Sequence, residues 1–246
     1  MIHTELYRVR NYETDSQGKL TLLSLANYLQ DTADRHAIEL GVGMPALAEQ
    51  GLSWVLYRMK IKIHQWPQIT DEIRVETNPS GLERVLVFRD FRLYDQAGKL
   101  LMTVSSTWLV FDTDKRSMVS PAAYFMDIFE PYKEWEFLPR ATQKMPAIPG
   151  AEPLLREVGA RHNEIDTNDH VNNSVYFQWF LEPLATPFLS SNRCVEFDII
   201  FKKECSREDR IVSSAYTLDS TSFLHVITNQ EGKEVAVGTS YWREAI

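Results

Sequence analysis

Hydrophobic positions recur at intervals of three and four residues between positions 21 and 40 of the chain. This spacing predicts a helix with one buried face, and Gly41 follows it where a left-handed residue commonly ends a helix. Further along, the period changes to two, which is typical of strands that bury one face. The apolar stripe of the predicted helix consists of Leu22, Leu25, Ala26, Leu29, Ala33 and Ala37.

The first half of the chain combines this helix with a series of predicted strands. A short strand at 6–12 and a turn at 15–18 precede the helix. Glycine, proline and polar residues predict further turns at 79–81 and 95–98. The predicted order is therefore strand, helix and antiparallel meander, with the meander strands at 54–63, 71–77, 83–94 and 99–110.

The same order of elements begins again in the second half of the chain. When the sequence is shifted by 151 positions, three charged residues before the first helix align with identical residues before a second helix. Because the predicted elements repeat as well, the sequence indicates a duplicated domain. The aligned pairs are Arg10 with Arg161, Glu13 with Glu164, and Asp15 with Asp166.

The second half is predicted to contain a helix at 174–189 and four strands. Residues 122–154 have no clean period and, together with Pro121, contain six of the eleven prolines, which indicates a connector. A helix stripe and alternating strands must bury one another, so each half is expected to be a long helix wrapped by an antiparallel sheet, an α+β fold. The expected boundaries are 1–121 for the first domain and 155–246 for the second. The four strands are predicted at 194–203, 209–217, 223–229 and 235–241.

Composition narrows the classes of protein to consider. The 246 residues are 44% hydrophobic and 24% charged, as in ordinary globular proteins, and the net charge of -8 argues against binding to nucleic acid or anionic lipid. The sequence has neither a signal peptide nor about 18 uninterrupted apolar residues, so a cytoplasmic protein without membrane insertion is expected. Cys194 and Cys205 are the only cysteines, which excludes a disulfide framework.

The run from Asp166 to Asn173 carries the densest set of reactive groups, and Glu204 and Cys205 follow it after the second predicted helix. Carboxylates, an imidazole, amides and a thiol can transfer protons and stabilise an oxyanion. A polar turn or helix N-cap explains Asp166 or Asn172 equally well. A calcium loop would need Gly and Glu at positions where the chain lacks them, and no zinc ligand spacing is present. No metal site is therefore expected.

Glu204 and Cys205 are predicted to follow the strand at 194–203 and to point to opposite faces of the sheet, because side chains alternate along a strand. Cys205 would then share the face of Phe197, Ile199 and Phe201, so it is expected to be a packed thiol. Glu204 is the preferred catalytic residue of the pair.

The first copy of the repeat lacks these reactive groups. Gln17 and Lys19 align with Asn168 and His170 at the shift of 151, and a shift of 138 places Trp66 and Pro67 on Glu204 and Cys205. The second copy is thus expected to be catalytic and the first to bind. Aromatic residues of the second helix fall at core spacing and are expected to pack rather than to contact substrate; these are Tyr176, Trp179 and Phe180.

The motif from Asp166 to Asn173, followed by Phe201-Lys202-Lys203-Glu204-Cys205, resembles the acyl-acyl-carrier-protein thioesterases of plants and bacteria. The resemblance spans nearly the whole chain and is supported by the strands at 54–59 and 106–110. It implies two fused hotdog domains. The chain departs from plant members at Asp169, and it lacks a plastid transit extension, which fits a bacterial-type cytosolic form.

The resemblance places functional groups on Asp166, Asn168, His170 and Glu204, with Cys205 at the position of a thiol once proposed as nucleophile. It implies hydrolysis of a fatty acyl thioester. In the preferred mechanism, Glu204 is held by Asn168 and His170 and activates a water, while Asp166 orients the loop. Amide hydrogens near the start of the second helix would stabilise the oxyanion. The alternative is attack by Cys205 with His170 as base.

The implied partner is acyl carrier protein with its bound fatty acyl chain, and no cofactor is implied. Because that carrier is acidic, it would have to dock on cations near the motif, and Arg161, Lys202 and Lys203 are the candidates. An acyl-coenzyme A thioesterase and a non-catalytic acyl-binding protein remain alternatives. Both a monomer and a homodimer remain open.

Overall fold

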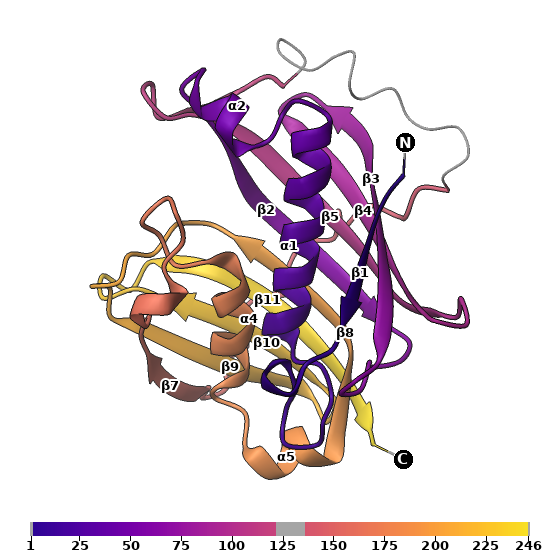
Figure 1. Ribbon diagram of the computed structural model, residues 1–246. Coiled ribbons are helices and arrows are strands. Elements are labelled where there is room, and N and C mark those ends of the chain that lie inside the picture. Colours follow the sequence, from indigo (N-terminus) through magenta and orange to yellow (C-terminus); the bar gives the residue numbers. More distant parts are fainter. Residues whose placement is uncertain (1, 122–135, 246) are drawn as a thin grey trace. The chain divides into compact units, whose positions relative to one another are not determined.

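The computed structural model describes residues 2–121 and 136–245, which form two compact units (Figure 1). Part of the connector expected at 122–154 therefore lies outside the described residues, because 122–135 are not described. Of the described residues, the first unit comprises those up to Leu20 and those from Asn27 to Ala141, and the second comprises Thr21–Ala26 and those from Thr142 onward. The first residues of α1 (Leu22–Glu39) are thus grouped with the second unit.

The first unit is built on an antiparallel sheet in the order β1-β3-β4-β5-β2, and the short strand β6 pairs with β5. Helix α1 lies between β1 and β2 in the chain, as the sequence predicted. The elements are β1 (His3–Arg8), a 3-10 turn η1 (Asn11–Glu13), α1 (Leu22–Glu39), α2 (Met44–Ala48), β2 (Leu52–Ile63), β3 (Glu72–Glu83), β4 (Leu86–Asp95), β5 (Leu100–Asp112) and β6 (Ser117–Val119).

Helix α1 confirms the predicted helix almost to the residue. All six positions of the predicted apolar stripe are buried. The helix ends where Gly41 adopts a φ of 73°. The amide of Gly41 donates to the carbonyl of Ile38 at 3.0 Å, and that of Val42 donates to the carbonyl of Ala37 at 2.8 Å. These two bonds satisfy carbonyls of the last helical turn, as in a Schellman ending.

Two predicted boundaries in the first unit are wrong. The residues expected to form a turn at 79–81 lie inside β3, and the chain reverses at Arg84-Val85 instead. The pairing of β3 with β4 shifts register between Pro79 and Gly81. A bulge of this kind accepts a proline, which has no amide hydrogen to donate to the ladder. The strand expected at 6–12 ends at Arg8, because η1 follows it.

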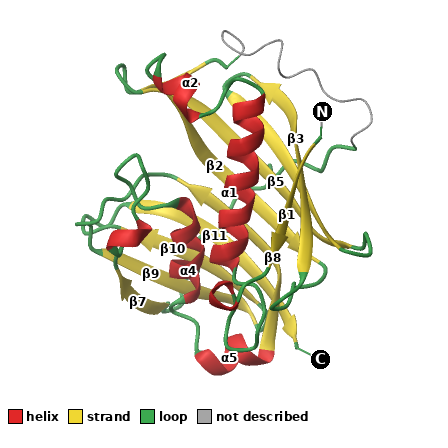
Figure 2. Ribbon diagram, viewed as in Figure 1, coloured by secondary structure: helices red, strands yellow, loops and turns green. Residues whose placement is uncertain are grey.

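The second unit contains an antiparallel sheet in the order β8-β11-β10-β9-β7 (Figure 2). Its four longer strands confirm the four predicted ones, with ends displaced by a few residues. The elements are β7 (Leu154–Val158), a 3-10 turn η3 (His162–Glu164), α4 (Asn173–Leu181), α5 (Thr186–Ser191), β8 (Asn192–Phe201), β9 (Ile211–Asp219), β10 (Ser222–Thr228) and β11 (Glu234–Glu244).

The single helix predicted at 174–189 is wrong, because two short helices occupy this stretch. Helix α4 stops at Leu181 and is followed by Pro183, and a residue that precedes a proline is disfavoured in the helical conformation. Helix α5 then begins with Pro187 in its first turn, where a proline costs no hydrogen bond. The expected long helix is therefore present in the first unit but not in the second.

Aromatic rings fill the space between α4 and the sheet of the second unit. The ring of Phe197 on β8 lies 5.4 Å from that of Phe177 and 5.9 Å from that of Phe180, between centroids. His225 on β10 lies 6.0 Å from Phe197, and burial lowers the pKa of this histidine to about 3. Tyr176, Trp179 and Phe180 are all buried, which confirms that these aromatic residues pack in the core.

The described ends of the connector contact the units to which they belong. In the first unit, the amide of Leu138 donates to the carboxylate of Asp90 at 2.8 Å, and the guanidinium of Arg140 lies 3.8 Å from the centre of the Phe88 ring. In the second unit, Met145 packs on the sheet face opposite α4, against a cluster that includes Leu224. The connector is thus anchored on each side of the stretch that is not described.

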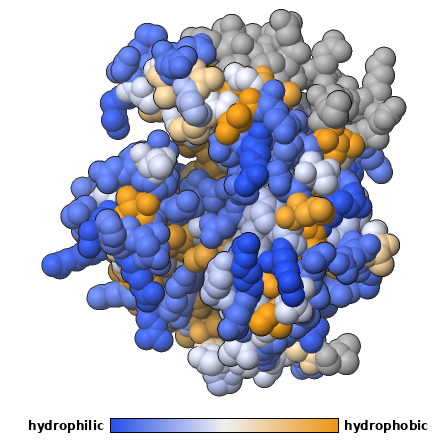
Figure 3. All heavy atoms as spheres, in the orientation of Figure 1, coloured by the Kyte–Doolittle hydropathy of each residue, from blue (hydrophilic) through white to orange (hydrophobic). Residues whose placement is uncertain are grey.

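The molecular surface is mainly polar on the face shown in Figure 3, where hydrophobic residues occupy small separate areas. Scattered exposed apolar side chains are normal for a globular protein. Within residues 2–121 and 136–245, none of the helices has the length and apolar character needed to cross a membrane.

Candidate functional site

Asp166 organises the loop that carries the first predicted motif. Its Oδ1 accepts hydrogen bonds from the amides of Asn168 at 2.8 Å and His170 at 3.2 Å. The amide of Asp166 donates to the carbonyl of His170 at 2.8 Å, and Asp169 takes a φ of 63° in the turn. A carboxylate that accepts backbone amides in this way holds the turn closed. Asp166 therefore has the structural role that the polar-turn interpretation described.

The same loop is tied to its surroundings by three hydrogen bonds near Asn172. The side chain of Asn172 caps α4 by accepting from the amide of Ser174 at 2.9 Å, and its own amide donates to the carbonyl of Glu164 at 2.8 Å. The amide of Val171 donates to the carbonyl of Cys205 at 2.8 Å. This last bond joins the motif directly to the Glu204-Cys205 segment.

Glu204 and Cys205 lie in a loop and not on a strand, because β8 ends at Phe201. The amides of Lys202 and Lys203 both donate to the carbonyl of Val235, at 2.9 and 3.1 Å, and the regular ladder stops there. The alternation of side chains that was extrapolated from the strand therefore does not apply to these two residues. Further along, Asp209 accepts the amide of Ser206 at 2.8 Å, and this bond and one from Gln230 hold its pKa below the usual range.

The two segments bring the side chains of His170 and Glu204 together. The Nε2 atom of His170 lies 3.3 Å from Oε2 of Glu204, and the two side chains are 39% and 59% exposed. An imidazole and a carboxylate at this distance share a proton or form an ion pair, and water reaches both. The pair has the groups and the access that general acid–base chemistry requires.

Cys205 is buried, in contrast to its neighbour Glu204. Its side chain is 1% exposed, and burial raises the pKa of the thiol. A hydrogen bond from Tyr176 acts in the opposite direction but does not reverse the shift. The expectation of a packed thiol is confirmed, although the physical reason is the loop and not the strand. A neutral buried thiol is a poor nucleophile.

Tyr176 on α4 supports the Glu204 loop from the protein interior. Its hydroxyl donates to the carbonyl of Lys203 at 3.5 Å and interacts with the thiol of Cys205, and burial raises its pKa. Sequence reasoning assigned this tyrosine to packing alone and missed the polar contacts. The signal was the choice of tyrosine where its buried neighbours Phe177 and Phe180 are phenylalanines.

The contact between His170 and Glu204 does not include Asn168, Lys202 or Arg161. Asn168 is exposed, and within the described part of the chain its side chain makes no hydrogen bond to Glu204. Lys202 forms an ion pair with Glu234. Arg161 is exposed, and its amide donates to the carboxylate of Glu164 at 2.7 Å, which caps η3.

The first unit repeats the loop scaffold without the reactive side chains. Asp15 accepts the amides of Gln17 at 2.8 Å and Lys19 at 3.0 Å, as Asp166 accepts those of Asn168 and His170. Gly18 has a φ of 75° at the position of Asp169. These contacts reproduce the shift of 151 positions that aligned the sequences.

The second segment is repeated in the same way. The amide of Leu20 donates to the carbonyl of Pro67 at 2.9 Å, and Asp71 accepts the amide of Gln68 at 2.8 Å. Both contacts match those of the second unit, with Leu20 aligned to Val171 at the shift of 151 and Pro67, Gln68 and Asp71 aligned at the shift of 138. Trp66 therefore occupies the position of Glu204, so the first unit has the scaffold but not the carboxylate.

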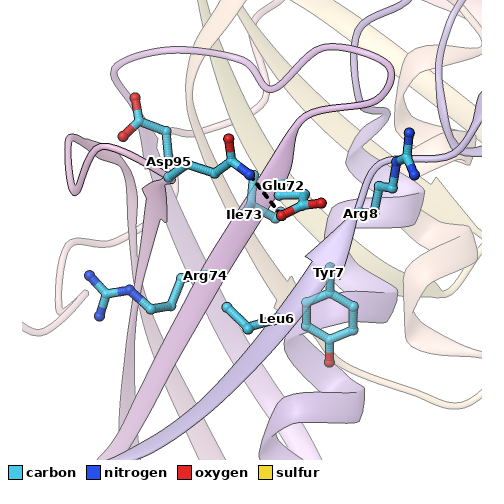
Figure 4. Close-up of a pocket in the computed structure, with 8 residues that line it drawn as sticks. Leu6, Tyr7, Arg8, Glu72, Ile73, Arg74 and Asp95 are labelled. Atoms are coloured by element: carbon cyan, nitrogen blue, oxygen red, sulfur yellow. Dashed lines mark hydrogen bonds between the residues drawn. The ribbon is translucent and has the colours of Figure 1, made fainter.

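A surface pocket of about 400 Å³ lies on the first unit between β1, β3 and the turn after β4 (Figure 4). A hydrogen bond of 2.7 Å from Gln96 to Glu72 crosses it. It shares no residue with the His170 and Glu204 site. Its lining consists of Leu6, Tyr7, Arg8, Glu72, Ile73, Arg74, Asp95 and Gln96.

Plant enzymes are among the curated proteins similar to this chain. A chloroplastic acyl-[acyl-carrier-protein] hydrolase of Cuphea viscosissima is 23% identical over 260 residues, and the match covers 99% of this chain but 63% of the Cuphea protein. An oleoyl-acyl carrier protein thioesterase of Arabidopsis thaliana is 26% identical, and the match covers 98% of this chain and 76% of that protein. The chain thus spans about two thirds to three quarters of the length of these relatives.

Solved structures with low sequence identity share the fold. An acyl-ACP thioesterase from Bacteroides thetaiotaomicron superposes with a TM-score of 0.89 at 21% identity, over 98% of each chain. The 12:0-ACP thioesterase from Umbellularia californica gives a TM-score of 0.84 at 21% identity, over 99% of this chain and 98% of that one. These likenesses confirm the expected pair of hotdog domains.

Two family models together match most of the chain. Residues 1–129 match the acyl-ACP thioesterase N-terminal domain, and residues 150–244 match the acyl-ACP thioesterase C-terminal domain. The chain belongs to the acyl-ACP thioesterase family.

Proposed function

We propose that this protein hydrolyses fatty acyl-acyl-carrier-protein thioesters to a free fatty acid and the carrier-protein thiol. The observation that carries the proposal is the contact of 3.3 Å between His170 and Glu204, in a loop scaffold that the first unit repeats without these groups. Family membership and the names of the plant relatives support the same reaction. The reaction needs water and a base, and the site offers an accessible carboxylate.

In the proposed mechanism, Glu204 removes a proton from a water molecule that attacks the thioester carbonyl. His170 fixes the orientation of the carboxylate through Nε2, and Asp166 holds the loop that carries His170. Asn168, which is exposed in the same loop as His170, would contact the substrate or the water. The bond between carbonyl carbon and sulfur then breaks, and the thiolate leaves with the carrier protein and takes up a proton.

The oxyanion that forms during attack needs hydrogen-bond donors, and the start of α4 supplies a candidate. The amides of Ser174 and Val175 are already used by Asn172. The amide of Asn173 has no acceptor among the residues that the structure describes. It lies at the positive end of the helix dipole, so it is the donor that we assign to the oxyanion.

The two units would have different roles in the reaction. The second unit, with Glu204 and His170, carries the chemistry. In the first unit Trp66 and Lys19 stand at the equivalent positions, which supports a role in binding the acyl chain without catalysis. The proposed domain boundaries remain 1–121 and 155–246, joined by the connector.

The test of this function is a thioester panel. We expect release of free thiol and fatty acid from acyl carrier protein thioesters between octanoyl and stearoyl, faster than from the matching coenzyme A thioesters. Faster turnover of the coenzyme A series would assign the protein to the acyl-coenzyme A thioesterases. Binding of the acyl carriers without any release of thiol would instead indicate a non-catalytic acyl-binding protein.

Replacing Cys205 with alanine is expected to leave turnover close to that of the native protein. The thiol is buried and burial raises its pKa, which disfavours the thiolate that would attack, so this prediction follows from the proposed mechanism. Steady-state kinetics of Cys205→Ala measure this directly, with Cys194→Ala as a control for the loss of another buried thiol. Loss of activity in Cys205→Ala alone, with an intact fold, would favour a cysteine nucleophile.

Charge reversal of Lys202 and Lys203 is expected to weaken carrier-protein substrates selectively. Acyl carrier protein is the acidic partner that we propose. The double variant, with glutamate at both positions, should therefore have a KM for acyl carrier protein thioesters that is roughly tenfold higher, and its KM for coenzyme A thioesters should rise less. Kinetics with both carriers provide the comparison. The control variant Lys144→Glu with Arg243→Glu has the same change in net charge at exposed positions elsewhere in the second unit. Equal losses for both carriers would remove these lysines from the docking surface.

A further inference from the structure

The hydroxyl of Tyr176 is a buried polar group that contacts the loop of the proposed base. Tyr176 lies on α4, and its side chain is buried. Its hydroxyl donates to the carbonyl of Lys203 at 3.5 Å and forms a hydrogen bond with the thiol of Cys205. These two acceptors belong to the residues that precede and follow Glu204 in the chain. One hydroxyl therefore contacts the segment on both sides of the proposed base.

Tyr176 acts as a hydrogen-bond donor and not as an acid or a base. Burial raises the pKa of its phenol, and the charge of Glu204 acts in the same direction, so the hydroxyl keeps its proton. A phenol has one hydrogen to donate, and either acceptor can take it. When the thiol of Cys205 is removed, the carbonyl of Lys203 remains as an acceptor. This agrees with the small effect expected for Cys205→Ala.

The core of the second unit fixes the ring that carries this hydroxyl. The ring centroid of Tyr176 lies 5.2 Å from that of Trp179 on the same helix and 5.4 Å from that of Phe201, the last residue of β8. All three side chains are buried. Side chains packed in this way keep a single position, so the hydroxyl gives the loop a fixed point of attachment.

The first copy of the repeat has neither the hydroxyl nor the carboxylate. At the shift of 151, Leu25 stands at the position of Tyr176, and it is fully buried. At the shift of 138, Trp66 stands at the position of Glu204. The tyrosine hydroxyl and the carboxylate thus occur together in one copy and are absent together from the other.

The backbone scaffold of the loop does not require this hydroxyl. In the second copy the amide of Val171 donates to the carbonyl of Cys205 at 2.8 Å, and in the first copy the amide of Leu20 donates to that of Pro67 at 2.9 Å. The first copy makes this bond although Leu25 supplies no hydroxyl. A buried hydroxyl costs free energy unless it is paired, so its presence in one copy alone indicates a task that belongs to that copy.

The task that distinguishes the second copy is to hold a carboxylate in place. Glu204 lies in a loop beyond the end of β8, and its side chain is 59% exposed. A long exposed side chain samples many rotamers, whereas a general base must keep its geometry toward the water and the substrate. The contact with His170 at 3.3 Å restrains the carboxylate, but the backbone of the loop also has to be fixed.

We propose that Tyr176 is a positioning residue for Glu204. Its hydroxyl holds the backbone at Lys203 and thereby sets the carboxylate against His170 and the attacking water. Tyr176 has no proton-transfer step of its own and acts through Glu204. The inference rests on the proposed function, because it adds a residue to the same site.

Replacing Tyr176 with phenylalanine removes the hydroxyl and keeps the packed ring. The single-turnover rate of thiol release from an acyl carrier protein thioester should fall roughly tenfold, while the KM stays unchanged because carrier binding is not affected. The Tm should stay close to that of the native protein. The control Tyr216→Phe removes the hydroxyl of a half-buried tyrosine on the sheet face opposite α4, and it should keep the native rate.

A double-mutant cycle with Glu204→Gln separates positioning from general support of the fold. If the hydroxyl acts through the carboxylate, Tyr176→Phe should cost nothing further in a protein that already carries Glu204→Gln. The same tenfold loss in both backgrounds would show that Tyr176 acts independently of Glu204 and would overturn the proposal. A clear drop in Tm together with a raised KM would assign Tyr176 to the fold and also overturn it.

The cycle also distinguishes a failure of this inference from a failure of the proposed function. A native rate in Tyr176→Phe together with a large loss in Glu204→Gln would reject the positioning role and retain the proposed base. Native rates in both variants would reject the proposed base and the positioning role with it.

Discussion

Replacing Glu204 with glutamine is expected to lower the turnover of acyl carrier protein thioesters by about two to four orders of magnitude, the usual contribution of a general base. Glutamine preserves the size of the side chain and can still contact His170, but it cannot accept a proton from water. Single-turnover measurement of thiol release isolates the chemical step from carrier binding. The KM should change little, because Glu204 acts on the water and not on the carrier.

Glu208→Gln is the matched control, because Glu208 is an exposed acid in the same segment of the chain. It should retain native turnover. If Glu204→Gln and Glu208→Gln are equally active, the base must be another group, and the contact between His170 and Glu204 would be an incidental surface pair.

Truncating Phe197 to alanine is expected to reduce the free energy of unfolding of the second unit by about 3–5 kcal/mol, as for other large buried aromatic residues. The ring is fully buried and lies between Phe177, Phe180 and His225. Its loss leaves a cavity beneath α4, the helix whose N-terminus is proposed to bind the oxyanion. Urea unfolding monitored by tryptophan fluorescence measures the change.

Tyr241→Ala provides the comparison for this stability prediction. Tyr241 lies on β11, the strand paired with β8, but it is 40% exposed. Its truncation should cost clearly less than that of Phe197. Similar costs for both variants would mean that the aromatic cluster under α4 does not dominate the stability of the second unit.

Local patterns in the sequence predicted the elements best where two independent signals agreed. The stripe of α1 and the following Gly41 predicted both its face and its end, because spacing and backbone conformation agreed there. Two predictions that involved prolines were wrong, and the errors were of opposite kinds. Pro79 was interpreted as a turn although a bulge accommodates it within β3, whereas Pro183 was passed over although it ends α4.

The sequence identified the segments that form the candidate site, but residue spacing alone did not predict the contacts between their side chains. The residue types of the Asp166 loop and the Glu204-Cys205 pair identified both segments, and the resemblance to a family ordered them. The resemblance implied a contact of His170 with Glu204, but the spacing of the residues alone did not predict it, because the contact depends on β8 ending at Phe201. The support from Tyr176 depends on the conformation of the same loop. The hydrophobic periodicity of the sequence gives no information about loop conformation.

The repeated loop scaffold has a consequence for how this protein can vary. When two identical subunits form a pair, every substitution appears in both, so a change that improves catalysis in one also alters the other. Here Asp15 and Asp166 belong to separate codons of one chain, and each loop can accumulate changes independently. The first loop can thus carry Trp66 where the second carries Glu204, and a substitution in one loop leaves the other unchanged.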